Sequence, residues 1–190
     1  MSRYYFFQDV ERFQVREVLR CLLHTILFNR ALGAVRAVDS ECDVLGDAEK
    51  ISYVRCDAPF VENAVERGVE QFHRSLEKEQ KGTVTLAFYN VVEKKTAFFF
   101  NKEEKIYWER WVIPFSTATE KCKVHPGESG ARQVAEGSSS GLNRQDITCL
   151  QMLKDRLGTI IENVDKNKDH IPPLKNDNIV SFPFEVGVGQ

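Results

Sequence analysis

Cys21 and His24 are the residues whose types and spacing come nearest to catalytic chemistry. A thiol beside an imidazole base can act as a nucleophile, and these two residues lie three positions apart in the chain. They fall in a segment whose apolar spacing predicts a helix, where a buried thiol and a histidine near the helix flank explain the pair without catalysis. A small enzyme that uses Cys21 or Cys56 as its nucleophile stays open as an alternative, but we predict that the protein is not an enzyme.

The other histidines and cysteines do not have the spacing of a metal or cofactor site. His73, His125 and His170 are isolated, and the five cysteines contain no CxxC pair. The serines between Gly137 and Gly141 lack the glycine spacing and the lysine of a phosphate-binding loop. We therefore predict no metal and no cofactor, and we interpret the cysteines as reduced thiols of a cytoplasmic protein.

The composition describes an ordinary globular chain. A net charge of -2 gives no general attraction for nucleic acid or anionic lipid. No stretch approaches the roughly 20 apolar residues of a membrane span. With 190 residues, 42% of them hydrophobic, the chain can form one core, so we expect a single domain over residues 1–190.

Hydrophobic periodicity predicts seven elements that must hold these residues. Three helices are predicted at residues 13–32, 59–76 and 147–164. Strands are predicted at residues 51–56, 83–92, 106–115 and 179–186. The last should lie at an edge or contain a bulge, because Pro183 cannot donate a hydrogen bond. This order indicates an α+β fold, with helices packed over a largely antiparallel sheet.

Residues 116–146 have a different composition from the rest of the chain. The segment contains a proline, four glycines, a run of three serines and scattered charges, with little apolar area to offset the entropy cost of ordering. We predict a disordered insertion there.

The connection between the second and third predicted strands is the feature that composition explains least. Phe98, Phe99 and Phe100 are flanked on both sides by lysine and glutamate. Burying one phenylalanine stabilises a protein by roughly 1.5 to 3 kcal/mol, so three rings left in water would forgo several times that. Either the three rings fold back onto the core or a partner covers them.

Several segments together resemble the autophagy-related protein 101 family. They are LRCLLHTILFNRALG at residues 19–33, YVRC at 53–56, FY at 88–89, YWERW at 107–111 and DHIPP at 169–173. The match keeps its order over most of the chain and excludes residues 116–146, so it is more specific than any one segment.

The resemblance implies a HORMA domain without catalytic activity. In this family the domain is similar to an open, fixed form that pairs with the HORMA domain of autophagy-related protein 13 and stabilises it inside the starvation-responsive, autophagy-initiation kinase complex. It further implies a cytoplasmic protein that is recruited to the phagophore assembly site. From its aromatic and basic side chains, we predict the helix end at Phe28, Asn29 and Arg30 as a possible heterodimer surface.

The family also carries an exposed Trp-Phe finger, which is thought to recruit downstream autophagy factors. Counting back from Trp108 places Phe99 at the finger tryptophan and Phe100 at its phenylalanine. This sequence therefore keeps an apolar tip but loses the indole N–H donor. Because binding energy concentrates in a few aromatic anchors, we predict that Phe98, Phe99 and Phe100 form a partner-binding finger loop.

A HORMA adaptor of the checkpoint or DNA-repair kind is the main alternative. Such a protein clamps a short peptide beneath a C-terminal belt that rearranges. Here only a few residues follow the last predicted strand, whereas animal relatives look longer at this end. The short terminal segment favours the autophagy adaptor.

Overall fold

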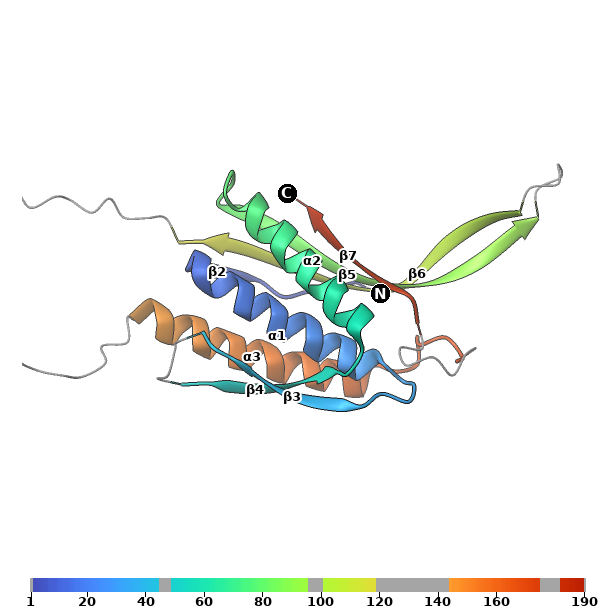
Figure 1. The fold of residues 1–190 in the computed structure, drawn as a ribbon, viewed down its shortest axis with the longest axis horizontal. Helices are drawn as coiled ribbons and strands as arrows, with labels where there is room; N and C mark the ends of the chain where they lie inside the picture. The colour runs from blue at the N-terminus through green and yellow to red at the C-terminus, as the bar shows by residue number, and fades with distance from the viewer. Residues whose placement is uncertain (1, 45–48, 96–100, 119–143, 175–181, 190) are drawn as a thin grey trace, which may run out of the picture.

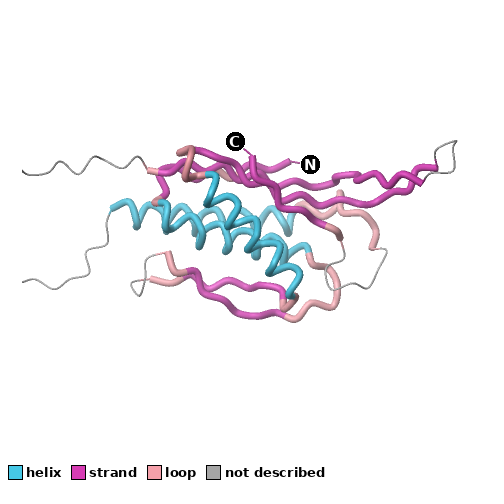
Figure 2. The backbone as a smooth tube through the Cα atoms, turned by 45° about the horizontal axis from the view of Figure 1, so that its top comes forward, coloured by secondary structure: helices cyan, strands magenta, loops and turns pink. Residues whose placement is uncertain are grey.

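The computed structural model shows three layers, with helices between a large sheet and a small one. It describes residues 2–44, 49–95, 101–118, 144–174 and 182–189. The helices cover one face of a five-stranded sheet, and a two-stranded hairpin lies on the opposite side of the helices (Figures 1 and 2). The α+β class and the three-helix backing are confirmed.

The three predicted helices are present, with somewhat different ends. They are α1 (Arg12–Arg30), α2 (Pro59–Ser75) and α3 (Arg144–Lys166). Helix α1 begins with a capping box, in which the Glu11 amide donates to the Gln14 side chain at 3.2 Å. Helix α2 begins at Pro59, where a missing N–H is tolerated because first-turn amides have no partner within the helix. Among the described helices, none is long and apolar enough to cross a bilayer.

The large sheet is mostly antiparallel and has the strand order β1-β6-β5-β7, with β2 also paired to β6. Its long central strands are β5 (Lys81–Lys95) and β6 (Asn101–Thr117), which pair antiparallel. The C-terminal strand β7 (Phe184–Gly189) pairs antiparallel with β5. Strands β1 (Ser2–Tyr4) and β2 (Phe7–Val10) pair parallel with β6 and make the sheet mixed.

The second sheet is the hairpin of β3 (Ala37–Cys42) and β4 (Ile51–Cys56). Strand β4 was predicted from its sequence, but β3 was not, because its acidic and small residues give no apolar alternation. Strands β1 and β2 were missed because three or four residues are too few for a periodic pattern. Each of these three strands forms by pairing with a neighbouring strand, so its own residues do not show that it is a strand.

The predicted bounds of the insertion and the predicted start of the last strand are wrong. Ser116 and Thr117 belong to β6, and positions 144–146 are the first turn of α3, so the predicted insertion is shorter than residues 116–146. Its remaining positions 119–143 lie outside the described residues, and disorder there stays a prediction. The last strand begins at Phe184, five positions later than predicted, and Pro183 precedes it with its carbonyl accepting the Tyr89 amide at 3.1 Å.

The core surrounds α1, which packs between the large sheet and the β3–β4 hairpin, with α2 and α3 on its flanks. In β6 the odd-numbered residues Glu109, Trp111, Ile113 and Phe115 are all buried, as expected when alternate side chains face the helices. Helix α2 approaches closely at Gly68, where an added Cβ would lie 2.4 Å from a Val186 methyl carbon. Helix and strand can pack this tightly only because the glycine has no side chain.

His24 is buried in α1, and it generates a prediction about acid stability. Its ring stacks on Tyr53 of β4, and among the described residues its Nδ1 has no hydrogen-bond partner. Burial lowers the pKa of His24 to about 4, with the nearby Arg55 charge as a smaller cause. The unfolded chain takes up this proton near pH 6.5, so the contribution of neutral His24 to stability is lost as the pH falls below that value.

We expect the free energy of unfolding to fall by about 2 kcal/mol between pH 7.5 and pH 5 because of this one residue. Urea unfolding at the two pH values measures the loss. The His24→Leu variant should lose most of this pH dependence, whereas His73→Gln, at a half-exposed position, should keep it. An equal slope in the wild type and His24→Leu would contradict the assignment.

Candidate functional site

A two-strand ribbon projects from the body of the protein. Strand β7 pairs with β5 only as far as Phe88, and β1 meets β6 from Arg110 onward. Beyond those points, the described residues of β5 and β6 pair with each other and extend past the helices (Figures 1 and 2). The last pair of the ribbon is Lys95 with Asn101, and these residues flank the segment that contains the three phenylalanines.

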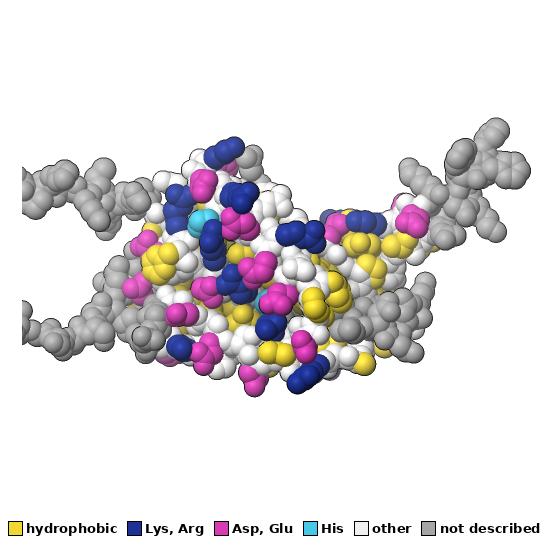
Figure 3. Space-filling view, in the orientation of Figure 1, with side chains coloured by type: hydrophobic (Ala, Val, Ile, Leu, Met, Phe, Trp, Pro, Cys, Tyr) yellow, Lys and Arg dark blue, Asp and Glu magenta, His cyan; other side chains and the backbone are white. Residues whose placement is uncertain are grey.

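Apolar side chains are exposed along this ribbon. Val91, Val92 and Ile106 are 43%, 36% and 50% exposed. Val91 and Val92 are consecutive in β5, so they point to opposite faces of the ribbon. Among the described elements, no helix covers either face (Figures 1 and 2). Figure 3 shows the hydrophobic side chains that gather on the visible face near the ribbon. Exposed apolar residues that cluster on a protrusion are typical of a protein-interaction surface.

A β-bulge sets the direction in which the ribbon leaves the sheet. Phe88 pairs with Glu109 and Tyr89 pairs with Tyr107, which leaves Trp108 as the extra residue. A bulge of this kind bends the strand and increases its twist. The bulge at Trp108 in β6 therefore sets the direction of the ribbon.

Aromatic rings pack around the bulge on the side that faces the helices. The Trp108 ring lies 5.4 Å from Phe88, 4.8 Å from Phe182 and 5.8 Å from His170 between ring centroids. Phe184 of β7 lies 6.4 Å from Phe88. Aromatic pairs at such distances contribute about 0.5 to 1.5 kcal/mol beyond their buried area. This aromatic cluster fixes the inner side of the ribbon base.

Polar contacts fix the outer side of the same base. Glu185 of β7 accepts hydrogen bonds from the Lys105 ammonium and the Tyr107 hydroxyl, both at 2.6 Å. The Lys105 ammonium also lies 4.4 Å from the centre of the Tyr89 ring, a cation–π contact. The hydrogen bonds from Lys105 and Tyr107 lower the pKa of the Glu185 carboxyl. Strand β7 thus holds the ribbon from its outer face.

A buried ion pair lies directly beneath the bulge. Both oxygens of Glu109 accept hydrogen bonds from the Arg30 guanidinium, at 2.7 and 3.0 Å, and both side chains are fully buried. Arg3 of β1 lies 3.6 Å from the same carboxylate, and His170 lies 3.4 Å from it. Four segments of the chain therefore meet at Glu109.

The Arg30 guanidinium also donates hydrogen bonds to backbone carbonyl groups at the C-terminal end of α3. It donates to the carbonyl oxygens of Val164 at 3.3 Å and Asn167 at 3.4 Å. The last carbonyls of a helix have no partner within it, and a cation there is favourable. Arg30 therefore joins the C-terminal ends of α1 and α3 to the base of the ribbon.

This placement corrects one of the predicted pairing residues. Arg30 is 1% exposed, so the expectation that its charge faces a partner is wrong. Phe28 is half-buried against the core, and Asn29 donates to the Thr25 carbonyl at 2.8 Å. The heterodimer surface at Phe28 and Asn29 stays a prediction. Phe98, Phe99 and Phe100 lie outside the described residues, and the finger likewise stays a prediction.

The two candidate nucleophiles are both buried. Cys21 and Cys56 are 0% exposed. Burial raises the pKa of the Cys56 thiol to about 11, so little of it is thiolate at neutral pH, whereas a nucleophile needs the thiolate. His24 stacks on Tyr53. Among the described residues, no cluster of three or more histidine, cysteine or acidic side chains could hold a metal ion.

Fold and site together define an α+β protein that presents a partly apolar β-ribbon on a firmly packed base. The family model for autophagy-related protein 101 matches residues 8–178, and the chain belongs to that family. Its relatives include autophagy-related protein 101 of Arabidopsis thaliana, 37% identical over 185 residues that cover 95% of this chain and 83% of that protein. Human autophagy-related protein 101 is 28% identical over 196 residues, covering 95% of this chain and 79% of that protein. The family assignment gives the chain a role in autophagy.

The Glu109 centre was missed from the sequence, although a signal was present. Glu109 stands in phase with Trp111, Ile113 and Phe115, so a buried position in the strand carries a charge. Arg30 follows Ile26 and Leu27 at helical spacing on the buried face of α1. Buried charges are rare unless they are paired. Two residues of opposite charge, each at a position that its element buries, therefore indicate an ion pair.

Removing one partner of this buried pair should destabilise the protein strongly. We expect Glu109→Gln to lower the free energy of unfolding by about 3 kcal/mol, because Arg30 and Arg3 are left buried without their counter-charge. Denaturant unfolding of the purified protein measures it. The matched control, Glu162→Gln in an exposed pair with Lys166, should cost less than about 1 kcal/mol. Equal losses in the two variants would contradict a structural role for Glu109.

Proposed function

We propose that this protein is a non-catalytic adaptor of the autophagy-initiation kinase complex, built on a HORMA domain. The observation that carries the proposal is the ribbon: exposed apolar residues extend from a base held by aromatic packing on one face and by Glu185 on the other. The family membership supports a role in autophagy, and the burial of Cys21 and Cys56 favours binding over catalysis.

Its proposed partner is the HORMA domain of autophagy-related protein 13, which it would bind and stabilise as a heterodimer. The proposed contact surface includes Phe28 and Asn29, at the end of α1. The hydrogen bond from the buried Arg30 guanidinium to Glu109 would hold this helix end in place. The proposed location is the cytoplasm, with recruitment to the phagophore assembly site when autophagy starts.

Downstream autophagy factors are proposed to bind the finger loop through Phe98, Phe99 and Phe100. The ribbon supports this proposal, because the pair Lys95 and Asn101 at its far end flanks the finger segment. A ribbon whose direction is fixed reduces the entropy lost when a partner binds its tip. Phe99 replaces an indole donor, so we expect recognition by apolar contact.

Gel filtration tests whether the proposed heterodimer forms. We expect the purified chain to co-migrate on gel filtration with the autophagy-related protein 13 HORMA domain of the same organism, at micromolar concentration. Separate elution at that concentration would count against the adaptor role. A tight complex with a linear peptide, formed with release of β7 from β5 in hydrogen exchange, would favour the peptide-clamping alternative.

Placing charges in the finger loop tests whether its phenylalanines bind a partner. We expect the double variant Phe99→Asp and Phe100→Asp to block autophagosome formation in starved cells, while heterodimer assembly and Tm stay unchanged. Aspartate removes apolar contact area and adds a charge that a partner would have to desolvate. The control is Ile161→Asp, at an exposed apolar position on α3. A lower Tm in the purified double variant would show that the rings belong to the core.

A further inference from the structure

The large sheet has one face that none of the described elements covers. The three helices and the β3–β4 hairpin all lie on the other side of the sheet (Figure 2). In β6 the odd-numbered residues face the helices, so the even-numbered residues point to the uncovered side, which we call the outer face. An antiparallel sheet can leave one face to water, and that face is then polar. Exposed apolar residues on the outer face therefore need an explanation.

Two exposed aromatic rings lie at one margin of the outer face. Tyr4 and Phe6 are 69% and 52% exposed, and they alternate with the buried residues Tyr5 and Phe7. Tyr4 pairs with Val112 of β6, which is half-buried on the same face. Exposed aromatic side chains that contribute little to their own core are typical anchors of a protein interface. This margin of the outer face therefore has the composition of a binding surface.

Two glycines of β7 lie at the opposite margin. The row of paired residues across the sheet is Tyr4, Val112, Thr85 and Gly187. Among the described residues, a Cβ added at Gly187 would meet only the Thr85 carbonyl oxygen, at 3.9 Å, and one added at Gly189 would meet nothing within 4 Å. The packing of this chain therefore requires neither glycine. Because glycine weakens a strand, its presence often marks the close approach of another backbone.

An exposed cation lies on the outer face where the ribbon begins. Arg110 of β6 places its guanidinium 4.6 Å from the centre of the Tyr107 ring. The Glu185 carboxylate on the same face is already bonded to Lys105 and Tyr107. Within the part of the chain that the structure describes, Arg110 forms no ion pair. Its guanidinium is therefore available to a carboxylate of a partner.

We propose that the outer face binds an amphipathic helix of a partner protein, with an acidic residue at the end that meets Arg110. The apolar stripe of this helix packs on Tyr4, Phe6 and Val112, and its backbone approaches the sheet over Gly187. A partner strand would instead pair with an edge of the sheet and leave the aromatic rings exposed. With the helix bound, helices cover both faces of the sheet, which is a stable layer arrangement.

A photoreactive amino acid in place of Tyr4 identifies the occupant in cells. The same probe in place of Phe13, which is 65% exposed on α1, is the reference. We expect position 4 to cross-link a partner segment that has apolar residues at helical spacing and an aspartate or glutamate near one end, identified by mass spectrometry of the linked peptides. A cross-link to lipid, to a second copy, within the same chain or to a segment without this pattern would overturn the proposal. No cross-link above the position 13 reference would overturn it as well.

The cross-linked segment, made as a synthetic peptide, is then titrated against the purified full chain by fluorescence anisotropy. We expect Gly187→Val to weaken binding by about tenfold, because the added side chain keeps the helix backbone away from the sheet. Its Tm should be no lower than that of the wild type, since valine favours a strand. Tyr4→Ala should also weaken binding by about tenfold, at a side chain outside the core.

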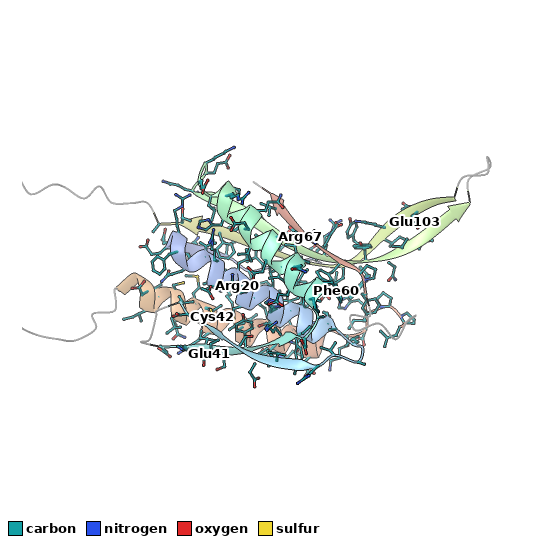
Figure 4. All side chains as sticks on the ribbon, viewed as in Figure 1. Arg20, Glu41, Cys42, Phe60, Arg67 and Glu103 are labelled. Carbon is teal, nitrogen blue, oxygen red and sulfur yellow. The ribbon has the colours of Figure 1, made fainter. Side chains whose placement is uncertain are left out.

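Charge reversal at Arg110 tests where the acidic end of the helix binds. Arg110→Glu should weaken binding by about fivefold, and the difference from the wild type should shrink at high salt. The control is Arg67→Glu, at an exposed position on α2, which lies on the other side of the sheet (Figure 4). Wild-type affinity in Gly187→Val, Tyr4→Ala or Arg110→Glu would overturn the proposal. The outer face is separate from the finger loop and from the end of α1, so this result would leave the proposed adaptor role untouched.

Discussion

The buried ion pair between Arg30 and Glu109 is the interaction on which the arrangement depends. It joins the last turn of α1 to the sheet, and the same guanidinium satisfies carbonyls at the end of α3. Arg3 brings the first strand to the same carboxylate. Buried charges are costly to desolvate, so a centre that brings four segments together persists only if its hydrogen bonds are met.

The position of Glu109 links this centre to the ribbon. The next residue toward the ribbon is Trp108, which forms the bulge and packs against Phe88 and Phe182. A shift of the carboxylate would therefore move the bulge, and with it the direction of the ribbon. The body thus provides a fixed platform, and the exposed apolar residues of the ribbon are available to a partner.

Much of the fold was predictable because its signals are local. The three helices follow from apolar residues at spacings of three and four, and the central strands follow from β-branched and aromatic residues. The short strands β1 and β2 were not predictable, because only their pairing with β6 makes them strands. The additional length of β5 and β6 was missed because Glu93 to Lys95 and the acids after Asn101 have the composition of a loop.

The site was predictable only in part, because a sequence does not show which charges are buried. The place of Arg30 at a helix end predicts a surface residue, whereas its helical spacing from Leu27 indicates the core. The ribbon base depends on contacts between residues far apart in the chain, such as Tyr107 with Glu185. No local pattern contains that information.

We propose that the ribbon contacts a partner while the body stays intact. A photoreactive amino acid at Val92, introduced in cells and activated after starvation, tests it directly, with the same probe at Ile161 of α3 as the reference. The account predicts a cross-link from position 92 to a second protein, absent at position 161. Cross-links from position 92 only to the protein's own helices would contradict it.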